Sequence, residues 1–409
     1  MEFSQLKSWV ESANGSLFPI QNLPLGICSY NNKKIVCSRL GDFIIDLSLL
    51  YENNFLSIPG LELRHLQNDY LNDFISLGAD NISNLRKQLI RLFSVENSTQ
   101  SGMLQSYMIS IDDCILHLPI SVGDYTDFYS SKEHATNVGI MFRDPANALL
   151  PNWLHLPVGY HGRASSIVTS GTDIKRPAGQ IVLKDGEVPV YSKCKQLDFE
   201  LEMGFVIGKE NKLGEPIPIQ ETLNHVFGLI LFNDWSARDI QKWEYVPLGP
   251  FLGKNFASTV SPWIISLDAL AEFKTEGPVQ SPTPLEYLSP EPLRNFDIQL
   301  EVYINDTLVS KSNTKYLYWS ISQQLAHHTV NGCNMRIGDL CASGTISGPE
   351  ASSFGSMLEL AWKGTKPIPM NDGSTRVFLQ DGDVVKMIAF TENKNYRIGF
   401  GECIGKIVS

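Results

Sequence analysis

The sequence predicts a mostly β protein of the α+β class, built from a small N-terminal part and a larger C-terminal part. Short apolar segments rich in β-forming residues recur along the chain between turn residues, and such segments indicate strands. Helical periodicity is confined to a few short segments. Polar and aromatic residues become denser from residue 121 onward. We therefore place the boundary near residue 118, which gives two predicted domains, residues 1–118 and 119–409.

The composition excludes several classes of protein. The 409 residues carry a formal net charge of −11 without any run of lysine or arginine, so we expect no nucleic-acid partner and no anionic membrane partner. The seven cysteines are scattered and form no C-x-x-C pair, which favours reduced thiols in a cytoplasmic protein over disulfides or structural zinc. No segment has about 18 consecutive apolar residues, so neither a signal peptide nor a transmembrane helix is expected.

The N-terminal part is predicted to contain short strands and one helix. Residues 27–36 and 42–47 are rich in β-forming residues and are punctuated by asparagine and glycine turn signals. Residues 84–93 place leucine and isoleucine at the spacing of an amphipathic helix. No candidate catalytic group stands out in this part, and its predicted role is packing or assembly.

Two glutamates stand out in a predicted strand over residues 198–207. Successive side chains of a strand point to opposite faces, so Glu200 and Glu202 share one face. Residues 203–207 are apolar apart from one glycine, which is typical of a strand covered on both sides. A buried carboxylate pair must be neutralised by protons, a basic residue or a hard cation. The spacing alone is more typical of a solvated strand face, so a metal site requires further ligands.

Further carboxylates lie in the C-terminal part. Asp127 falls in an extended segment between turns at residues 123–131, and residues 227–232 form a predicted buried strand that ends at Asp234. Together with the two glutamates, these aspartates come from three separated segments. Four carboxylates without a cysteine form an oxygen-donor set that suits Ca²⁺, Mg²⁺ or Mn²⁺ and does not suit structural zinc.

Basic and hydrogen-bonding residues follow the same strand. A predicted helix places Arg238, Gln241 and Tyr245 on one side, at offsets of three and four residues. Residues 249–258 superficially resemble a phosphate-binding P-loop, but three residues separate the glycines where that loop needs four, and an asparagine replaces the final Ser or Thr. We therefore reject nucleotide binding there. Lys254 remains as a lone cation among glycine and apolar residues.

The remaining elements follow from periodicity and capping signals. Residues 296–304 alternate apolar and polar side chains and turn back into residues 307–309, which predicts a hairpin. Ser320 and Gln323 have the spacing of a capping box, which predicts a helix over residues 321–331. We also expect a short helix at 222–226, an irregular proline-rich excursion at 275–293, and strands at 384–390 and 405–408.

Four strings of the sequence combine the candidate residues with aromatic and hydroxyl side chains. They are Tyr125-Thr126-Asp127-Phe128-Tyr129-Ser130-Ser131 with His134-Ala135-Thr136-Asn137, then Asp198-Phe199-Glu200-Leu201-Glu202, Asn233-Asp234-Trp235-Ser236-Ala237-Arg238-Asp239, and Gly355-Ser356-Met357-Leu358-Glu359. These strings closely resemble the fumarylacetoacetate hydrolase family, and the resemblance covers essentially the whole chain. It implies a small SH3-like N-terminal barrel, a large C-terminal domain of mixed β-rolls or a β-sandwich, and a homodimer.

The resemblance also implies two ion positions. The implied Ca²⁺ ligands are Asp127, Glu200, Glu202 and Asp234. A Mg²⁺ position would be associated with Asp234, Lys254 and Ser258. The sequence departs from the family at residues 257 and 258, where glycine and threonine are expected and the chain has Ala257 and Ser258. Because the hydroxyl is retained, this departure concerns only the details of the outer ion position.

Catalytic and substrate-binding roles are implied in the same way. His134 would be the general base, oriented by Glu359. The residues that would stabilise developing negative charge are Arg238, Gln241 and Lys254. The implied substrate contacts are Tyr129, Arg143, Tyr160, Gln241, Tyr245 and Thr345.

The activity implied by the resemblance is hydrolysis of the carbon–carbon bond of 4-fumarylacetoacetate to fumarate and acetoacetate, the last step of tyrosine and phenylalanine breakdown. Two other readings stay open. An acylpyruvate hydrolase or an oxaloacetate decarboxylase of the same superfamily would keep the carboxylates and act on another small keto acid. A non-catalytic, metal-stabilised scaffold would also keep the carboxylates but would have no need for His134 paired with Glu359.

Overall fold

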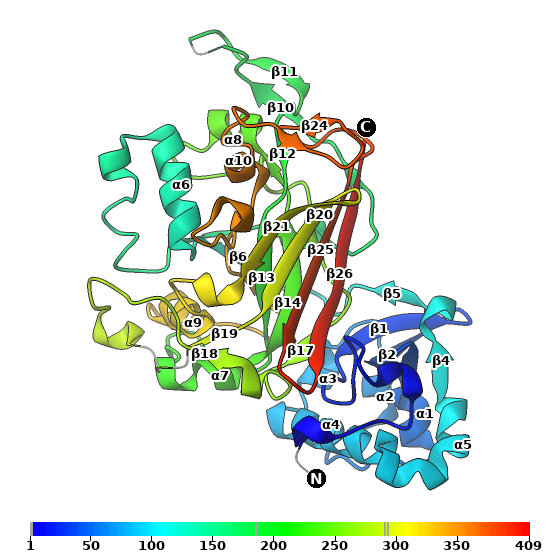
Figure 1. The fold of residues 1–409 in the computed structure, drawn as a ribbon. Coiled ribbons are helices and arrows are strands. Elements are labelled where there is room, and N and C mark those ends of the chain that lie inside the picture. The colour runs from blue at the N-terminus through cyan, green and yellow to red at the C-terminus, as the bar shows by residue number, and fades with distance from the viewer. Residues whose placement is uncertain (1–2, 185, 290–291, 293) are drawn as a thin grey trace.

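The computed structural model describes residues 3–184, 186–289, 292 and 294–409, and it shows a strand-rich α+β fold (Figure 1). The N-terminal part lies to one side of a larger part that is dominated by long strands. The predicted fold class is therefore confirmed. Within the described residues, no helix is both long enough and apolar enough to cross a membrane.

The N-terminal part is built on a five-stranded antiparallel sheet with the order β4-β3-β2-β1-β5. Helix α4 covers this part with an apolar face that includes the buried Ile82, Leu85 and Leu89. It begins at Ala79, whereas the predicted helix begins at residue 84. The prediction starts too late because the first turn is mostly polar and carries little of the apolar periodicity. The elements are β1 Leu25–Tyr30, β2 Lys33–Leu40, β3 Phe43–Asp46, α1 Leu47–Glu52, α2 Leu63–Leu66, α3 Asn72–Ile75, α4 Ala79–Phe93, α5 Ser101–Leu104, β4 Met108–Ser110 and β5 Ile115–His117.

The larger part contains a curled sheet that carries the candidate residues. Its strand order is β7-β6-β22-β13-β14-β16-β8, and β17 pairs with β14 outside this path. All seven residues of β13 are buried, as the unbroken apolar pattern predicted. The strands are β6 Tyr125–Phe128, β7 Gly159–His161, β8 Ile167–Thr169, β13 Leu201–Ile207, β14 Val226–Asp234, β16 Ser258–Val260, β17 Ile265–Ser266 and β22 Leu340–Ala342.

A second sheet, with the order β21-β20-β25-β26-β9, packs in front of β13 and β14 (Figure 1). Strand β20 alternates half-buried and buried residues, as expected for the predicted hairpin. Gly405 of β26 permits a close approach to Trp235, since a Cβ there would lie 2.5 Å from the indole. The strands are β9 Ile174–Lys175, β20 Gln299–Ile304, β21 Thr307–Asn313, β25 Val384–Glu392 and β26 Arg397–Val408.

Short elements surround the two sheets. The predicted helix after Ser320 is confirmed as α9, with both hydrogen bonds of its capping box present. The other helices are α6 Lys132–Phe142, α7 Thr222–His225, α8 Arg238–Glu244 and α10 Met357–Leu360, and α9 spans Ile321–Thr329. The short strands pair as β10 Ala178–Ile181 with β11 Val190–Lys193, β12 Leu197–Asp198 with β15 Ser236–Ala237, β18 Lys274–Thr275 with β19 Asn295–Phe296, and β23 Ile368–Pro369 with β24 Thr375–Arg376.

The single strand predicted over residues 198–207 is wrong in one respect, because it is broken at Phe199 and Glu200. Strand β12 ends at Asp198, β13 begins at Leu201, and Glu200 forms only an isolated bridge with Ser356. The Glu200 N–H donates to the side-chain oxygen of Asn233, at 3.2 Å, in place of a strand carbonyl. A side chain from the neighbouring strand thus takes over part of the ladder, and local strand propensity cannot reveal this.

A buried ion pair between Arg376 and Asp383 lies just before β25 of the second sheet. Asp383 is 2% exposed and accepts hydrogen bonds from Arg376 Nε, at 2.9 Å, and from the Gln380 N–H, at 2.8 Å. Burial raises the pKa of the Asp383 carboxyl, but the hydrogen bonds from Arg376 and Gln380 outweigh this effect and the pKa is lowered.

Asp383→Asn should lower the free energy of unfolding at neutral pH by about 1.5–3 kcal/mol, the range for hydrogen bonds to a charged group. A carboxyl group whose pKa is lowered by folding stabilises the folded state at pH values above its pKa in the unfolded chain. This contribution is lost as the pH falls through the pKa of the folded state. The difference between wild type and variant should therefore shrink below about pH 4. Urea unfolding over a pH series measures it, and a pH-independent difference would contradict the assignment.

Candidate active site

Four buried carboxylates from separate elements meet at the curled sheet. One oxygen from each of Asp127, Glu200, Glu202 and Asp234 lies within 4.8 Å of the others. Their exposed fractions are 2%, 5%, 0% and 1%, respectively. The sequence analysis placed these residues together as candidate ligands, and the structure brings all four together.

Strand register explains why the carboxylates converge. Glu202 of β13 lies opposite Phe232 of β14, and Asp234 is two residues further along β14, so both carboxylates share one face. Asp127 of β6 lies opposite Tyr160 of β7. Three strands, β6, β13 and β14, thus present their carboxylates to the same space.

Two cations partly neutralise this acidic cluster. Lys254 Nζ donates to both Glu200 and Asp234, at 2.6 Å from Asp234 Oδ2. Arg238 Nη2 donates to Glu200 Oε1 at 2.7 Å. The Ser258 and Tyr160 hydroxyls donate to Asp234 at 2.8 and 3.1 Å. Glu200 and Asp234 are therefore well satisfied by direct contacts.

The other two carboxylates keep free acceptor atoms. Among the described residues, Asp127 Oδ1 and Glu202 Oε1 have no hydrogen-bond partner although they are buried. Burial and the neighbouring carboxylates raise the pKa of both groups well above the usual range. For Glu200, burial acts in the same direction, but Lys254 and Arg238 outweigh it and lower the pKa. Two buried carboxylate oxygens without a partner among the described residues fit an oxygen-seeking divalent cation.

A buried histidine–glutamate pair forms the second part of the site. His134, in the first turn of α6, places Nδ1 2.6 Å from Glu359 Oε2 on α10. Burial raises the pKa of Glu359, but the charge and hydrogen bond of His134 and the donors Asn137 and Ser356 outweigh it and lower the pKa. In the neutral imidazole, an Nδ1–H that donates to this carboxylate places the lone pair on Nε2, where it can accept a proton.

The structure brings some of the remaining predicted residues into this network and leaves others outside it. Gln241 Oε1 accepts from Arg238 Nη1 at 3.3 Å, and the Tyr129 ring packs edge-on against His134 at 5.2 Å. Thr345 is buried, and its hydroxyl has no hydrogen-bond partner among the described residues. Within the described part of the chain, no side-chain hydrogen bond joins Arg143 or Tyr245 to the carboxylates, and both residues are exposed.

Sequence reasoning assigned no role to several residues that support the site. Ser347, Ser356 and Asn137 all donate to the Glu359 carboxylate, at 2.8–2.9 Å. Asp198 contacts Arg238 and the first turn of α10. Asn137 carried a local signal, since it lies three residues after His134 on the same helix face. The serines lie in turns and carried no comparable signal.

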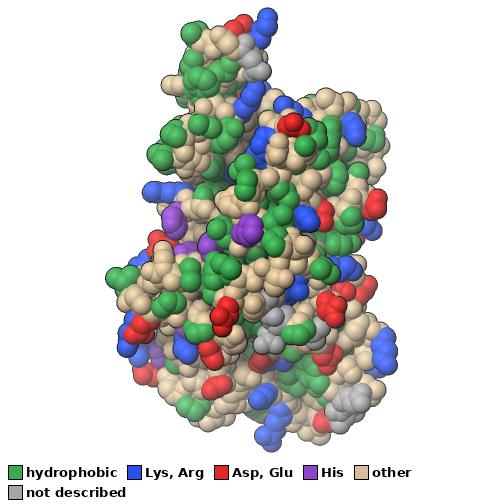
Figure 2. All heavy atoms as spheres, turned by 90° about the vertical axis from the view of Figure 1, so that its left-hand side faces the viewer, with side chains coloured by type: hydrophobic (Ala, Val, Ile, Leu, Met, Phe, Trp, Pro, Cys, Tyr) green, Lys and Arg blue, Asp and Glu red, His purple; other side chains and the backbone are tan. Residues whose placement is uncertain are grey.

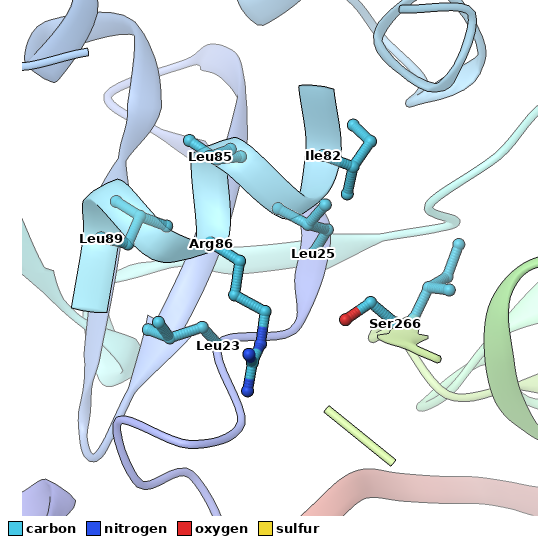
Figure 3. Close-up of a pocket in the computed structure, with 8 residues that line it drawn as sticks. Leu23, Leu25, Ile82, Leu85, Arg86, Leu89 and Ser266 are labelled. Carbon is cyan, nitrogen blue, oxygen red and sulfur yellow. The ribbon is translucent and has the colours of Figure 1, made fainter. Parts of the chain in front are cut away.

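Two small cavities lie away from the carboxylates. One, between α4 and β1, has mostly apolar walls and a volume of about 10 Å³, which is room for roughly one water molecule (Figure 3). The other, of about 20 Å³, lies between Met203, Phe296 and Thr314. Neither has the size expected of a substrate site. The first is lined by Leu23, Leu25, Ile82, Leu85, Arg86, Leu89, Ile264 and Ser266.

Comparisons with known proteins add an independent line of argument. Residues 124–408 match the family model described as fumarylacetoacetate hydrolase C-terminal, and residues 21–119 match the one described as fumarylacetoacetase N-terminal. The chain is 52% identical to the fumarylacetoacetase of Homo sapiens over 414 residues, which covers 98% of each protein. It is 50% identical to the fumarylacetoacetase of Dictyostelium discoideum, over 99% of this chain and 98% of that protein. The Arabidopsis thaliana fumarylacetoacetase is 46% identical, with 98% of each protein covered.

A solved structure agrees in fold. The fumarylacetoacetate hydrolase of the psychrophilic Exiguobacterium antarcticum superposes with a TM-score of 0.55 at 18% sequence identity. The match covers 95% of this chain and 99% of that chain. At this identity the likeness bears on the fold alone.

Glu202→Gln should weaken binding of Mg²⁺ and Ca²⁺ by at least about tenfold, since cation affinity depends on the number of charged ligands. The glutamine carbonyl can still accept the Gly344 N–H, which lies 2.9 Å from Glu202 Oε2, so the chelated variant should melt no lower than chelated wild type. Calorimetric titration of chelated protein measures the affinity, and the exposed substitution Glu215→Gln serves as control. Equal affinities for variant and wild type would remove Glu202 from the cation site.

Proposed function

The chain belongs to the fumarylacetoacetate hydrolase family, and from this premise we propose that it hydrolyses 4-fumarylacetoacetate to fumarate and acetoacetate. The observation that carries the proposal is the buried His134–Glu359 pair beside the four-carboxylate cluster. It occurs in a chain that aligns over nearly its full length with fumarylacetoacetases at about half identity. The reaction would close the breakdown of tyrosine and phenylalanine.

His134 supplies the base in this proposal. Hydrolysis between two carbonyl groups requires a water molecule that loses a proton as it attacks. The Nε2 lone pair can accept this proton, because Glu359 holds the Nδ1–H and stabilises the imidazolium that forms. Asn137 and two serines keep the Glu359 carboxylate in place. The geometry thus gives the base a fixed tautomer and a fixed orientation.

The acidic cluster would hold the cofactor of the reaction. We propose Ca²⁺ at Asp127, Glu200, Glu202 and Asp234, supported by the free oxygens of Asp127 and Glu202. When bound there, such a cation supplies Lewis-acid polarisation of carbonyl oxygens. Asp234, Lys254 and Ser258 would serve an outer Mg²⁺ position. Burial lowers the pKa of Lys254, but Asp234 and Glu200 outweigh it and raise the pKa, so Lys254 would act as a charged donor and not as a direct ligand.

Charge stabilisation and substrate binding involve the surrounding donors. Arg238, Gln241 and Lys254 lie in one hydrogen-bonded network and would stabilise the negative charge that develops as the carbon–carbon bond breaks. The unpartnered Thr345 hydroxyl is a donor available to a ligand. The two terminal carboxylates of substrate and products would be bound by donors chosen from Tyr129, Arg143, Tyr160, Gln241, Tyr245 and Thr345.

We further propose a homodimer, on the basis of exposed apolar side chains near one end of the molecule. Val188 and Tyr191 around the β10–β11 hairpin are 81% and 80% exposed, and Leu248 and Phe251 in the loop after α8 are 97% and 67% exposed. Trp243 of α8 donates to Gln180 of β10, at 3.3 Å, so the two regions adjoin. Figure 2 shows hydrophobic side chains on the projection at the top of the molecule. Such a patch favours burial against another chain.

The division of the chain and its compartment are also proposals. A boundary near residue 118, with an SH3-like N-terminal domain over 1–118 and a catalytic domain over 119–409, is supported by family matches that end at 119 and begin at 124. A cytoplasmic location is supported by the seven cysteines, which are all free thiols in the structure.

Purified protein incubated with 4-fumarylacetoacetate and Mg²⁺ or Ca²⁺ should lose the absorbance of the conjugated diketone while fumarate and acetoacetate appear in equal amounts. A panel with an acylpyruvate and oxaloacetate tests the rival reactions. Much faster turnover of either rival, or release of carbon dioxide, would contradict the proposed substrate. No turnover of any of the three would favour the non-catalytic scaffold.

His134→Ala should lower kcat by about 10² to 10⁴, the range for loss of a general base, while divalent cation binding stays close to wild type. His155→Ala, at an exposed position outside this network, is the control and should leave kcat unchanged. Stopped or continuous assays of fumarate release measure kcat, and circular dichroism checks the fold. Near-normal turnover in a folded His134→Ala protein would exclude His134 as the base.

A further inference from the structure

One buried carboxylate that has no assigned role joins the two halves of the site. Asp198 has no exposed surface and accepts three hydrogen bonds. Arg238 Nε donates to Asp198 Oδ2 at 2.8 Å. The backbone N–H groups of Met357 and Leu358 donate to Oδ1 and Oδ2, at 2.7 and 3.1 Å.

The partners of Asp198 lead in two directions. Arg238 continues through Nη2 to Glu200, at 2.7 Å, and therefore to the acidic cluster. Met357 and Leu358 form the first turn of α10, and the next residue is Glu359, which contacts His134. A rigid four-residue helix anchored at its first two amides has little freedom to move its third side chain. Asp198 is thus linked through Arg238 to Glu200 and, through the first turn of α10, to Glu359, which contacts His134.

The break between β12 and β13 allows Asp198 and Glu200 to contact the same arginine. Asp198 ends β12 and Glu200 follows the break before β13, so both carboxylates can meet the same guanidinium. Arg238 has a planar fork of donors that fits two carboxylates at once, whereas a lysine would offer a single point charge. The arrangement fixes the Arg238 side chain with its remaining donor, Nη1, directed at Gln241.

We propose that Asp198 is a positioning residue that fixes the positions of Arg238 and Glu359 relative to each other. The base His134 and the charge-stabilising donors can then act on the same substrate molecule. The inference rests on the proposed function for its kinetic consequence. Its structural consequence, a change at His134 caused by a residue that does not touch His134, is independent of the substrate.

The test compares Asp198→Asn with Asp383→Asn. Asp383 is a matched control because it is also buried, pairs with an arginine and accepts a backbone N–H, yet none of its side-chain hydrogen bonds within the described residues reaches a site residue. In Asp198→Asn the side chain keeps its shape but loses its charge. Its NH₂ group then replaces one of the two oxygens that accept from Arg238 and from the backbone N–H groups of α10. Two quantities are measured in each variant: kcat and KM with 4-fumarylacetoacetate, and the downfield proton resonance of the His134 Nδ1–H, identified by its absence in His134→Ala.

Asp198→Asn should lower kcat by about 100-fold with KM nearly unchanged, since small misplacements of catalytic groups cost about this much and the lost interactions act in the transition state. It should also shift or abolish the His134 Nδ1–H resonance. Asp383→Asn should change neither quantity, although it lowers stability. A normal kcat in Asp198→Asn, an unchanged His134 resonance, or equal losses in the control would each overturn the proposal. An inactive wild type with the expected resonance changes would instead contradict the proposed function.

If Asp198→Asn does not fold, Arg238→Lys provides the second test. A lysine at this position cannot hold Asp198 and Glu200 together, so the Asp198 carboxylate loses one of the contacts that fix its position. The carboxylate itself is retained, and it can still accept from the backbone N–H groups of Met357 and Leu358. The His134 Nδ1–H resonance should then shift, although the side-chain hydrogen bonds of Arg238 go to Asp198, Gln241 and Glu200 and not to His134. An unchanged resonance in folded Arg238→Lys would overturn the link.

Discussion

The structure depends on the partial neutralisation of four buried carboxylates by two cations, which contact Glu200 and Asp234 and leave oxygens of Asp127 and Glu202 without a partner among the described residues. Lys254 joins Glu200 to Asp234, and Arg238 joins Glu200 to Asp198, so the charged side chains form one continuous network inside the larger part. Removing one partner of a buried ion pair leaves an uncompensated charge and costs several kcal/mol, whereas an apolar replacement of the whole network can be neutral or stabilising. A network of this kind is therefore weak evidence for stability and good evidence for a chemical role.

The fold meets this requirement by placing the carboxylates on strands that cannot slip. Strand β13 is buried on both faces and pairs with β14 and β22, so a register shift of one residue would move Glu202 away from the other carboxylates and onto the opposite, apolar face. The same register fixes Glu202 and Asp234 on one face. The base is supported differently, through the short helix α10 and the capped first turn of α6. The two halves of the site thus belong to separate elements and require a connection such as Asp198.

Sequence reasoning recovered those features that depend on local pattern. The capping box of α9, the alternation in β20 and the apolar run in β13 all have periodic or spacing signals, and so do the two glutamates. It missed the break before β13, because the Glu200 N–H finds its partner in a side chain of β14. The link through Asp198 was equally hidden, since its partners lie 40 and about 160 residues away in the chain. Contacts of this separation are set by the tertiary fold and leave no periodic trace in the sequence.

The central claim is that the four carboxylates form a divalent cation site that the fold holds in place, and anomalous diffraction from crystals grown with Mn²⁺ tests it most directly. The account predicts an anomalous peak about 2.0–2.4 Å from oxygens of Asp127, Glu200, Glu202 and Asp234, with Lys254 still hydrogen-bonded to the cluster. A map with no peak at the cluster, at Mn²⁺ concentrations that saturate the activity of the enzyme, would contradict it.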